Sequence, residues 1–327
     1  MRRVTRTAMV LTAVVVLGGC WLQPGADARR SGFAPLKDGL DIQNVAQLHE
    51  QWTRQLGGTV KAPVVGPDGV YAVSGDFVVS GKLTAIDPGG GATRWSATLW
   101  DANIPYWPNA PTILDGKVHV PMLGGSTVLP STVKRFDAAS GAPLPSLANG
   151  ATTTVIGRDG TLVGTVALQV PPCCTAVSRF FVESTNGGGS WVSYLYIGGV
   201  ASLPVPTSAA VGTARFFIGQ GSALEAYPLT KPGNCTSQYS TDFCPPIWSV
   251  PLRSSVAGNP VLSEDETTVY AAAGDKLVAR YAADGTPRWT GTLGAPASAA
   301  PALANGYVFV PTNSGELDVF TTGCGKP

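Results

Sequence analysis

The sequence predicts an all-β protein, and within that class a β-propeller of four-stranded antiparallel blades. Gly and Pro account for 40 and 27 of the 327 residues, an excess that is typical of many short strands joined by turns. Charged residues make up 13% of the chain, compared with about 25% in typical soluble domains. One order of short β-prone runs also recurs six times along the chain, which indicates a repeat architecture.

The first repeat shows the unit most clearly. It runs through residues 62–65, 70–73 and 83–87 to Trp95, and each piece is a short β-prone run bounded by Gly, Pro or Asp. The six copies begin near residues 63, 111, 154, 206, 260 and 301. Their spacing of about 40 to 54 residues matches propeller blades of four strands.

A constant interval within the repeats supports this alignment. The end of the third run precedes a Trp by eight residues in three repeats, namely Asp87 to Trp95, Glu183 to Trp191 and Tyr281 to Trp289. The turn at residues 157–160 also matches the turn at residues 66–69 almost residue for residue. We therefore interpret the repeats as structural copies of one unit.

The direct count gives six blades, and seven is the alternative if the irregular middle of the chain holds another. The sixth copy lacks a fourth run with a Trp, and residues 51–56, before the first copy, look like that missing strand. We expect the N- and C-terminal strands to pair, with the Trp52 segment beside residues 317–320. Such pairing would close the ring and remove the open sheet edges.

The N-terminal residues predict export. Three arginines among the first six residues precede an apolar stretch at residues 8–17, which is a signal-peptide pattern and too short to span a bilayer. Leu17-Gly18-Gly19-Cys20 resembles the lipobox of bacterial lipoproteins, in which the Cys thiol is lipidated. The alternative is ordinary secretion with cleavage after residues 26–28, Ala-Asp-Ala.

This pattern divides the chain into three parts. We expect residues 1–19 to be a lipoprotein signal peptide, residues 20–39 a flexible tether and residues 40–327 the propeller. The mature protein would then be anchored through Cys20 at the extracytoplasmic face of a membrane, since two or three acyl chains hold a protein stably in a bilayer.

Residues 83–87, followed by Gly91 and Trp95, resemble the docking motif of PQQ-like propeller repeats, which are named after quinoprotein dehydrogenases. The lead-in to Trp52, with Asn44, Val45 and Leu48, is similar to the segment that opens such propellers, and the resemblance spans about residues 42 to 322. In this family the Gly turns the chain into the outer strand and the Trp packs between blades. The resemblance implies five blade-docking residues: Trp52, Trp95, Trp191, Trp248 and Trp289. The second unit departs from the motif, because Pro145 stands where the Trp belongs.

The loops suggest a candidate binding surface. If the strands of a blade are lettered a to d, the b–c loops and the connections between blades share one face, and the a–b and c–d turns share the other. Function often lies on variable loops. The connection from the first to the second unit carries the candidate residues Trp100, Asp101, Asn103, Tyr106 and Trp107. The alternative is that these aromatic rings only cover the core.

The cysteines suggest disulfides, since exported proteins fold in an oxidising compartment. Cys235 and Cys244 lie within a long insertion and are expected to pair. For Cys173 and Cys174 two alternatives stay open, because connectivity cannot be deduced from sequence. The family resemblance suggests a vicinal disulfide, which quinoprotein alcohol dehydrogenases carry against their cofactor. Otherwise one of the two pairs with Cys324.

Signals for catalysis are few. The two histidines, His49 and His119, stand alone in the sequence, and a lone His on a strand is usually packed or solvated. No nucleophile elbow, zinc-protease motif or phosphate loop occurs. The acidic run at residues 264–266 fits a solvated a–b turn better than a calcium cage. With a net charge of +1 and no basic run beyond the N-terminus, the chain lacks a nucleic-acid footprint.

These observations favour a non-catalytic cell-envelope lipoprotein whose propeller is a scaffold for protein interaction or ligand binding, with no catalytic, cofactor or metal site. The expected partner is an envelope protein, a small ligand or a glycan. The BamB-like lipoproteins of outer-membrane β-barrel assembly are the functional analogy that the resemblance suggests. The alternatives are a PQQ-dependent oxidoreductase, which would use PQQ and calcium, and a carbohydrate-binding propeller.

Overall fold

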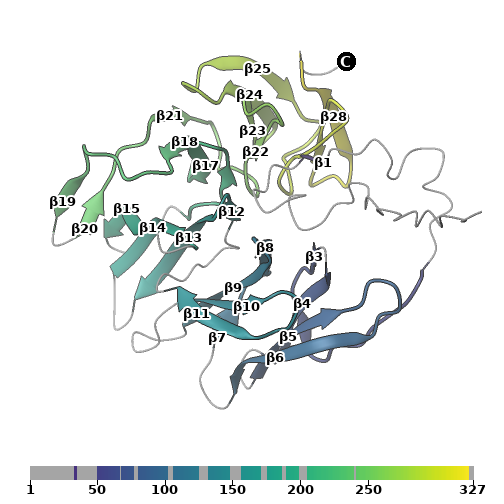
Figure 1. The fold of residues 1–327 in the computed structure, drawn as a ribbon. Helices are drawn as coiled ribbons and strands as arrows, with labels where there is room; N and C mark the ends of the chain where they lie inside the picture. The colour runs from purple at the N-terminus through teal and green to yellow at the C-terminus, as the bar shows by residue number, and fades with distance from the viewer. Residues whose placement is uncertain are drawn as a thin grey trace, which may run out of the picture.

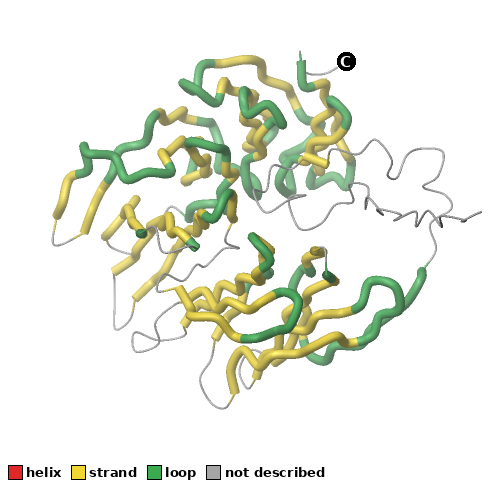
Figure 2. Tube along the Cα trace, in the orientation of Figure 1, coloured by secondary structure: helices red, strands yellow, loops and turns green. Residues whose placement is uncertain are grey.

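The computed structural model describes residues 33–34, 50–66, 68–76, 80–101, 106–124, 132–147, 156–170, 175–185, 189–198, 205–238 and 241–323. The regular structure in these ranges consists of β-strands (Figures 1 and 2). No helix long and apolar enough to cross a membrane occurs within them. The predicted all-β class is confirmed, and the sheets are arranged around a common centre as in a propeller (Figure 1).

Six sheets correspond to the six sequence repeats, counted over the described residues alone. Their strands pair antiparallel, apart from one parallel pair in the sixth sheet. The first sheet contains β2 (Thr59–Val60), β3 (Val64–Gly66), β4 (Gly69–Asp76), β5 (Ser80–Ile86) and β6 (Thr93–Asp101). The second contains β7 (Tyr106–Pro108), β8 (Thr112–Leu114), β9 (Lys117–Gly124), β10 (Thr132–Asp137) and β11 (Pro143–Leu147). The third contains β12 (Ile156–Arg158), β13 (Thr161–Val170), β14 (Thr175–Ser184) and β15 (Ser190–Gly198).

The remaining sheets follow the same order from the innermost to the outermost strand. The fourth contains β16 (Ala210–Val211), β17 (Arg215–Gln220), β18 (Ala223–Pro228) and β21 (Trp248–Pro251), and its insertion forms a hairpin of β19 (Thr236–Gln238) and β20 (Thr241–Phe243). The fifth contains β22 (Val261–Leu262), β23 (Thr268–Ala273), β24 (Lys276–Tyr281) and β25 (Pro287–Thr292). The sixth contains β26 (Ala302–Ala304), β27 (Tyr307–Pro311) and β28 (Leu317–Thr321), together with β1 (Phe33–Ala34).

The core lies between neighbouring sheets, as strand β23 illustrates. All six of its residues are buried, because both faces of the strand are covered. Val269 and Ala271 pack with side chains of the fourth sheet, and Tyr270 and Ala272 pack with side chains of the sixth. This two-sided burial explains why such a strand is apolar throughout rather than alternating.

One hydrogen bond recurs at the boundaries between sheets. The indole Nε1–H of each of the five docking tryptophans donates to a carbonyl just past the third strand of the next sheet. The five pairs are Trp52 to Pro88 at 2.9 Å, Trp95 to Ala138 at 3.0 Å, Trp191 to Leu229 at 2.9 Å, Trp248 to Ala282 at 3.1 Å and Trp289 to Thr322 at 3.2 Å. The structure therefore places these rings between blades.

The boundary between the second and third sheets is built differently. Arg135 on β10 donates from Nε to the carbonyl of Pro145 at 2.7 Å and from its guanidinium to the carbonyl of Thr185 at 3.1 Å. Thr185 follows β14 and provides the same carbonyl that a Trp contacts elsewhere. The guanidinium thus supplies the docking hydrogen bond where Pro145 replaces the Trp.

The ends of the chain differ from the predicted pairing. Residues 51–56 form no strand, and β28 lies at the edge of its sheet beside β27. The N-terminal segment that joins the sixth sheet is β1, which runs parallel to β26. Pairing of the Trp52 segment with β28 is therefore absent from the described residues. Trp52 and Arg54 make hydrogen bonds to residues 88–93 of the first sheet.

Candidate functional site

The structure contradicts the predicted binding surface at Trp100, the first of its five residues. The side chain of Trp100 is 6% exposed and packs in the core between the first two sheets. Its ring lies over Gly81, where an added Cβ would come within 1.9 Å of it. Trp100 therefore cannot form an open binding surface, as expected if the ring covers the core.

The other predicted loop residues are only partly described. Tyr106 and Trp107 lie on β7, which pairs with β9, and Asp101 ends β6. The side chains of these three residues, and Asn103 as a whole, lie outside the described residues. Beyond Trp100, the described residues do not test this predicted surface.

The predicted disulfide between Cys235 and Cys244 is present, and it closes the β19–β20 hairpin. The backbone N–H of Cys244 donates to the Ser193 hydroxyl on β15 at 2.9 Å, which holds the hairpin against the third sheet. The remaining predicted sites, together with the predicted signal peptide and nearly all of the tether, fall outside the described part of the chain: Cys20, His49, Cys173, Cys174 and Cys324.

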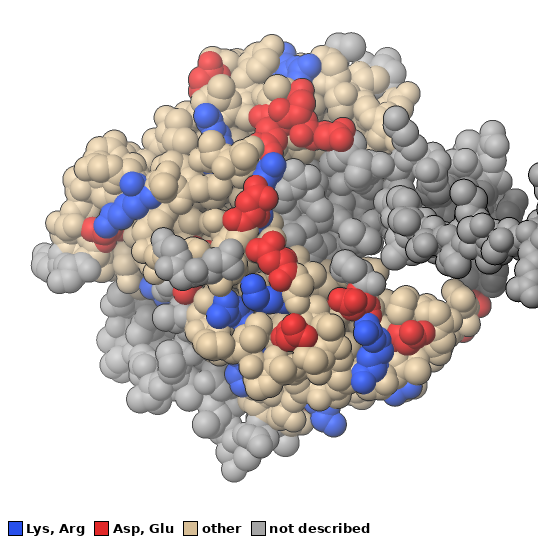
Figure 3. All heavy atoms as spheres, viewed as in Figure 1, with Lys and Arg blue, Asp and Glu red and all other residues tan. Residues whose placement is uncertain are grey.

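A different surface is built by the a–b turns. Acidic or amide side chains recur at these turns, at Asp68, Asp115, Asp159, Glu266 and Asn305. Four of the five adopt the left-handed backbone conformation, with φ of 51° at Asp115, 47° at Asp159, 56° at Glu266 and 49° at Asn305. Asp and Asn tolerate this conformation better than most residues. Figure 3 shows acidic side chains gathered on the face that holds these turns. We call the acids of the turns the acidic band: Asp68, Asp115, Asp159, Glu264, Asp265 and Glu266.

Glu266 connects the turns of three sheets. Its carboxylate forms an ion pair with Arg158 of the third sheet. The same carboxylate accepts hydrogen bonds from the backbone N–H of Thr213 at 2.8 Å and from the Thr213 hydroxyl, both in the fourth sheet. Glu266 is therefore not a solvated turn charge, which corrects the expectation for this residue of the 264–266 run.

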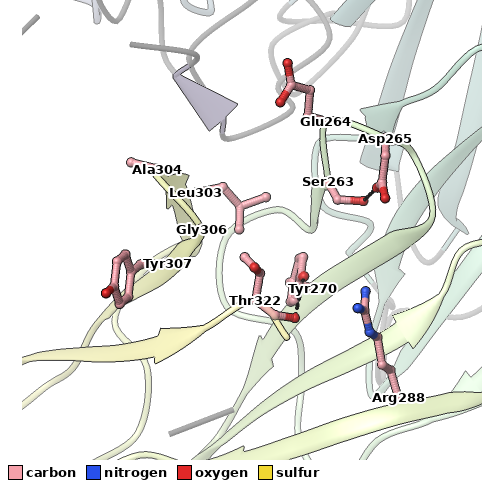
Figure 4. A pocket seen from close by; sticks show the side chains of 10 residues that line it. All are labelled: Ser263, Glu264, Asp265, Tyr270, Arg288, Leu303, Ala304, Gly306, Tyr307 and Thr322. Atoms are coloured by element: carbon pink, nitrogen blue, oxygen red, sulfur yellow. Dashed lines mark hydrogen bonds between the residues drawn. The ribbon is translucent and has the colours of Figure 1, made fainter. Parts of the chain in front are cut away.

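The other two acids of that run behave differently from Glu266. Asp265 accepts hydrogen bonds from the Ser263 hydroxyl at 2.6 Å and from the backbone N–H of Thr267 at 3.1 Å, and these bonds hold the turn. Glu264 is exposed. Its carboxylate points away from Tyr270 and Thr322 (Figure 4), so it presents its charge to solvent.

Two clefts flank this turn, one on each side of the fifth sheet. The cleft toward the sixth sheet has a volume of about 410 Å³, and its wall includes Tyr270, Arg288 and Tyr307 (Figure 4). The Tyr270 hydroxyl donates to the carbonyl of Thr322 at 3.2 Å. The cleft toward the fourth sheet measures about 490 Å³ and includes Arg215. We call the 263–268 turn and these two clefts the blade-five site.

Hydrogen bonds hold the pKa of two carboxylates of the site, Asp265 and Glu266, below the ordinary value. Burial alone would raise the pKa of Asp265, but hydrogen bonds from Ser263 and Thr267 outweigh it and lower the pKa. Burial likewise opposes ionisation of Glu266, and hydrogen bonds from Thr213 with the charge of Arg158 lower its pKa. Both groups act as hydrogen-bond acceptors with fixed charge, which is a chemistry of binding rather than proton transfer.

Sequence reasoning did not identify the partners of Glu266. Arg158 is 108 residues away from Glu266 along the chain, and a separation of that size leaves no local pattern. The match between the turns at residues 66–69 and 157–160 could have pointed to this surface. If that alignment is extended to the other repeats, it places an acid or Asn at the corresponding a–b turns.

The described residues contain no group of three or more His, Cys, Asp or Glu side chains that could hold a metal ion.

The comparisons with known proteins agree with the fold. Residues 245–326, which include the 263–268 turn, match the family model described as "Outer membrane protein assembly factor BamB". No curated protein matches the sequence.

Solved structures show the same architecture at low sequence identity. The Dos1 propeller is 9% identical with a TM-score of 0.56, covering 78% of this chain and 66% of that one. A europium-containing methanol dehydrogenase is 11% identical with a TM-score of 0.53, covering 94% and 85% of the two chains. Apo AztD from Citrobacter koseri is 10% identical with a TM-score of 0.51, covering 83% and 71%. At these identities the likeness extends to the fold alone.

Proposed function

We propose that this β-propeller of PQQ-like repeats is a non-catalytic scaffold of the bacterial cell envelope, and that it binds a partner protein through the blade-five site and the acidic band. The observation that carries the proposal is the convergence of acidic turns from several sheets on one face (Figure 3). Support comes from the matched family model, whose description names an assembly factor of outer membrane proteins and whose matched residues include the 263–268 turn of the site.

The geometry suits recognition of a basic segment with apolar side chains. The turn backbones hold the acids in place, so little conformational freedom is lost when a partner binds. Exposed charges such as Asp68 and Glu264 mainly steer association and make it salt-dependent. The clefts beside the turn offer space for side chains of the partner.

We also propose that Cys20 is lipidated and anchors the scaffold at the extracytoplasmic face. The lipobox-like sequence Leu17 to Cys20 supports this proposal. Mass spectrometry of the protein purified from membranes should find a diacylglyceryl-modified Cys20 at the mature N-terminus. Recovery of an unmodified mature chain that starts after Ala28 would favour ordinary secretion.

The partner proposal is tested by capture from the native envelope. Asp68→Lys combined with Glu264→Lys reverses two exposed charges of the acidic band. We expect the captured partner to fall at least tenfold relative to wild type at low salt. Glu316→Lys is the matched control, because Glu316 is exposed in the b–c loop of the sixth sheet, on the opposite face, and should capture normally.

Two outcomes would overturn this proposed function. Equal capture by the wild-type and double-variant proteins would remove the acidic band as the interface. A quinone spectrum with dye reduction after addition of PQQ and Ca²⁺ would favour the oxidoreductase alternative. The carbohydrate alternative relied on an aromatic loop surface, and burial of Trp100 removes one of its rings.

A further inference from the structure

Arg280 on β24 pairs with Val269 on β23. The corresponding third-strand position in four other sheets holds a buried side chain that is mainly apolar, namely Ile86, Phe136, Tyr227 and Phe320. These four residues are 3%, 4%, 2% and 0% exposed, respectively. The third sheet carries Glu183 at this position. The position is thus apolar in most sheets, and the fifth sheet is the one that places a cation there among the described residues.

Arg280 has no counter-ion within the described residues. Its Nε atom is buried and has no hydrogen-bond acceptor in the structure. Burial lowers the pKa of its guanidinium, and no carboxylate opposes that effect. The residue as a whole is partly buried, but a buried N–H donor without an acceptor is destabilising, so packing alone does not explain this residue.

Arg280 lines a cavity of about 330 Å³ between the fourth and fifth sheets. Two other cations line the same cavity: Arg253 in the connection between these sheets, and Lys276 at the start of β24. Thr290 adds a hydroxyl, and the lining includes neither Asp nor Glu. Lys276 forms an ion pair with Asp275 at 3.1 Å and a hydrogen bond with Thr292 at 3.0 Å, which orient its ammonium group.

We propose that this cavity binds an oxyanion, either a phosphate or a carboxylate group, with Arg280 as its main contact. A guanidinium presents parallel N–H donors that match two oxygens of such a group. Arg253 and Lys276 supply additional positive charge at the cavity wall. The bound anion provides the counter-charge that the protein itself lacks at Arg280. This site lies apart from the blade-five site and is independent of the proposed scaffold function.

The test measures thermal unfolding with inorganic phosphate and, separately, with citrate, at constant ionic strength set by NaCl. We expect the unfolding midpoint of the wild-type protein to rise and saturate with one of the two anions, since a ligand that binds only the folded state stabilises it. The anion whose effect saturates at the lower concentration, phosphate or citrate, identifies the preferred oxyanion as a phosphate or a carboxylate group.

Arg280→Leu is the decisive variant, because it introduces the apolar character found at this position in four other sheets. It should fold, unfold without anion at a midpoint no lower than wild type, and bind at least tenfold more weakly. Lys82→Gln, a cation on the first sheet, is the control and should bind as wild type does. Arg253→Gln combined with Lys276→Gln keeps Arg280 and should weaken binding by a smaller factor.

Saturation of Arg280→Leu at the wild-type concentration would overturn the proposal. So would a wild-type protein that responds to neither anion beyond the effect of NaCl.

Discussion

At the residue scale, His119 shows how one boundary replaces aromatic packing with polar groups. It occupies the register position that holds Tyr71 in the first sheet and Tyr270 in the fifth. His119 is fully buried. Burial, and next the charge of Arg135, lower its pKa to about 3. The imidazole is therefore neutral in the folded protein at physiological pH, as a packed rather than a catalytic side chain.

This environment predicts a pH dependence of stability. The pKa of His119 falls from 6.5 when unfolded to about 3 when folded, so between these values the unfolded chain binds a proton that the folded protein excludes. Stability is retained above pH 6.5 and lost as the pH falls toward 3. From pH 7 to pH 5 we expect a loss of about 2 kcal/mol from this group.

Urea unfolding at both pH values measures this loss. His119→Phe is the comparison, since Phe217 fills the corresponding position in the fourth sheet. The variant should lose about 2 kcal/mol less than wild type over the same interval. Equal losses in the two proteins would show that His119 does not carry the effect.

At the scale of the element, one glycine in each of three c–d turns meets two structural requirements, a positive φ and close contact with a docking tryptophan. Gly91, Gly141 and Gly285 have φ of 69°, 74° and 74°, which favours Gly because it has no Cβ. A docking ring also lies against each of them. An added Cβ would come within 2.9 Å of Trp52 at Gly91, within 2.5 Å of Trp95 at Gly141 and within 2.8 Å of Trp248 at Gly285. The turn and the docking of the preceding blade therefore depend on the same residue.

Gly189 separates the two requirements, because it has a positive φ but no contact with a docking ring. It has φ of 92°, but nothing lies within 4 Å of an added Cβ, as expected at the boundary where Arg135 replaces the Trp. Gly189→Ala should lose about 1 kcal/mol from backbone strain alone. Gly141→Ala should lose about 1 to 3 kcal/mol more, because Trp95 must move. Urea unfolding of the two variants measures the difference, and equal losses would contradict ring contact as the second requirement.

At the scale of the whole molecule, the docking hydrogen bond links successive sheets through residues far apart in sequence. The first sheet receives it from Trp52, which precedes that sheet in the chain. The segment around Trp52, which forms no strand, thus makes the docking contact that an outer strand makes elsewhere. The described residues do not show this segment paired with β28, so ring closure is not confirmed.

Trp52→Ala tests both docking and closure. Loss of the ring and its hydrogen bond should destabilise the protein by about 2 to 3 kcal/mol, and amides of the first sheet should exchange faster with solvent. In a closed ring the amides of β28 should also exchange faster. Amide exchange followed by NMR or mass spectrometry gives both readings. Faster exchange limited to the first sheet would contradict closure, whereas unchanged stability would contradict docking by Trp52.

The sequence by itself determined the all-β class, the four-stranded repeats, the docking tryptophans and the Cys235–Cys244 disulfide. These features arise from local causes, namely the alternation of strands, the chemistry of turns and the spacing of residues within one unit.

Only the tertiary structure decided how Arg135 replaces a Trp, that Trp100 is buried, that Glu266 meets Arg158 and that Arg280 has no counter-ion. Each of these depends on which side chains of neighbouring sheets come into contact. A repeat sequence specifies every blade and the docking residue that recurs in its motif. It does not specify the contacts that differ from one boundary to the next, because those are set by packing between residues distant in the chain.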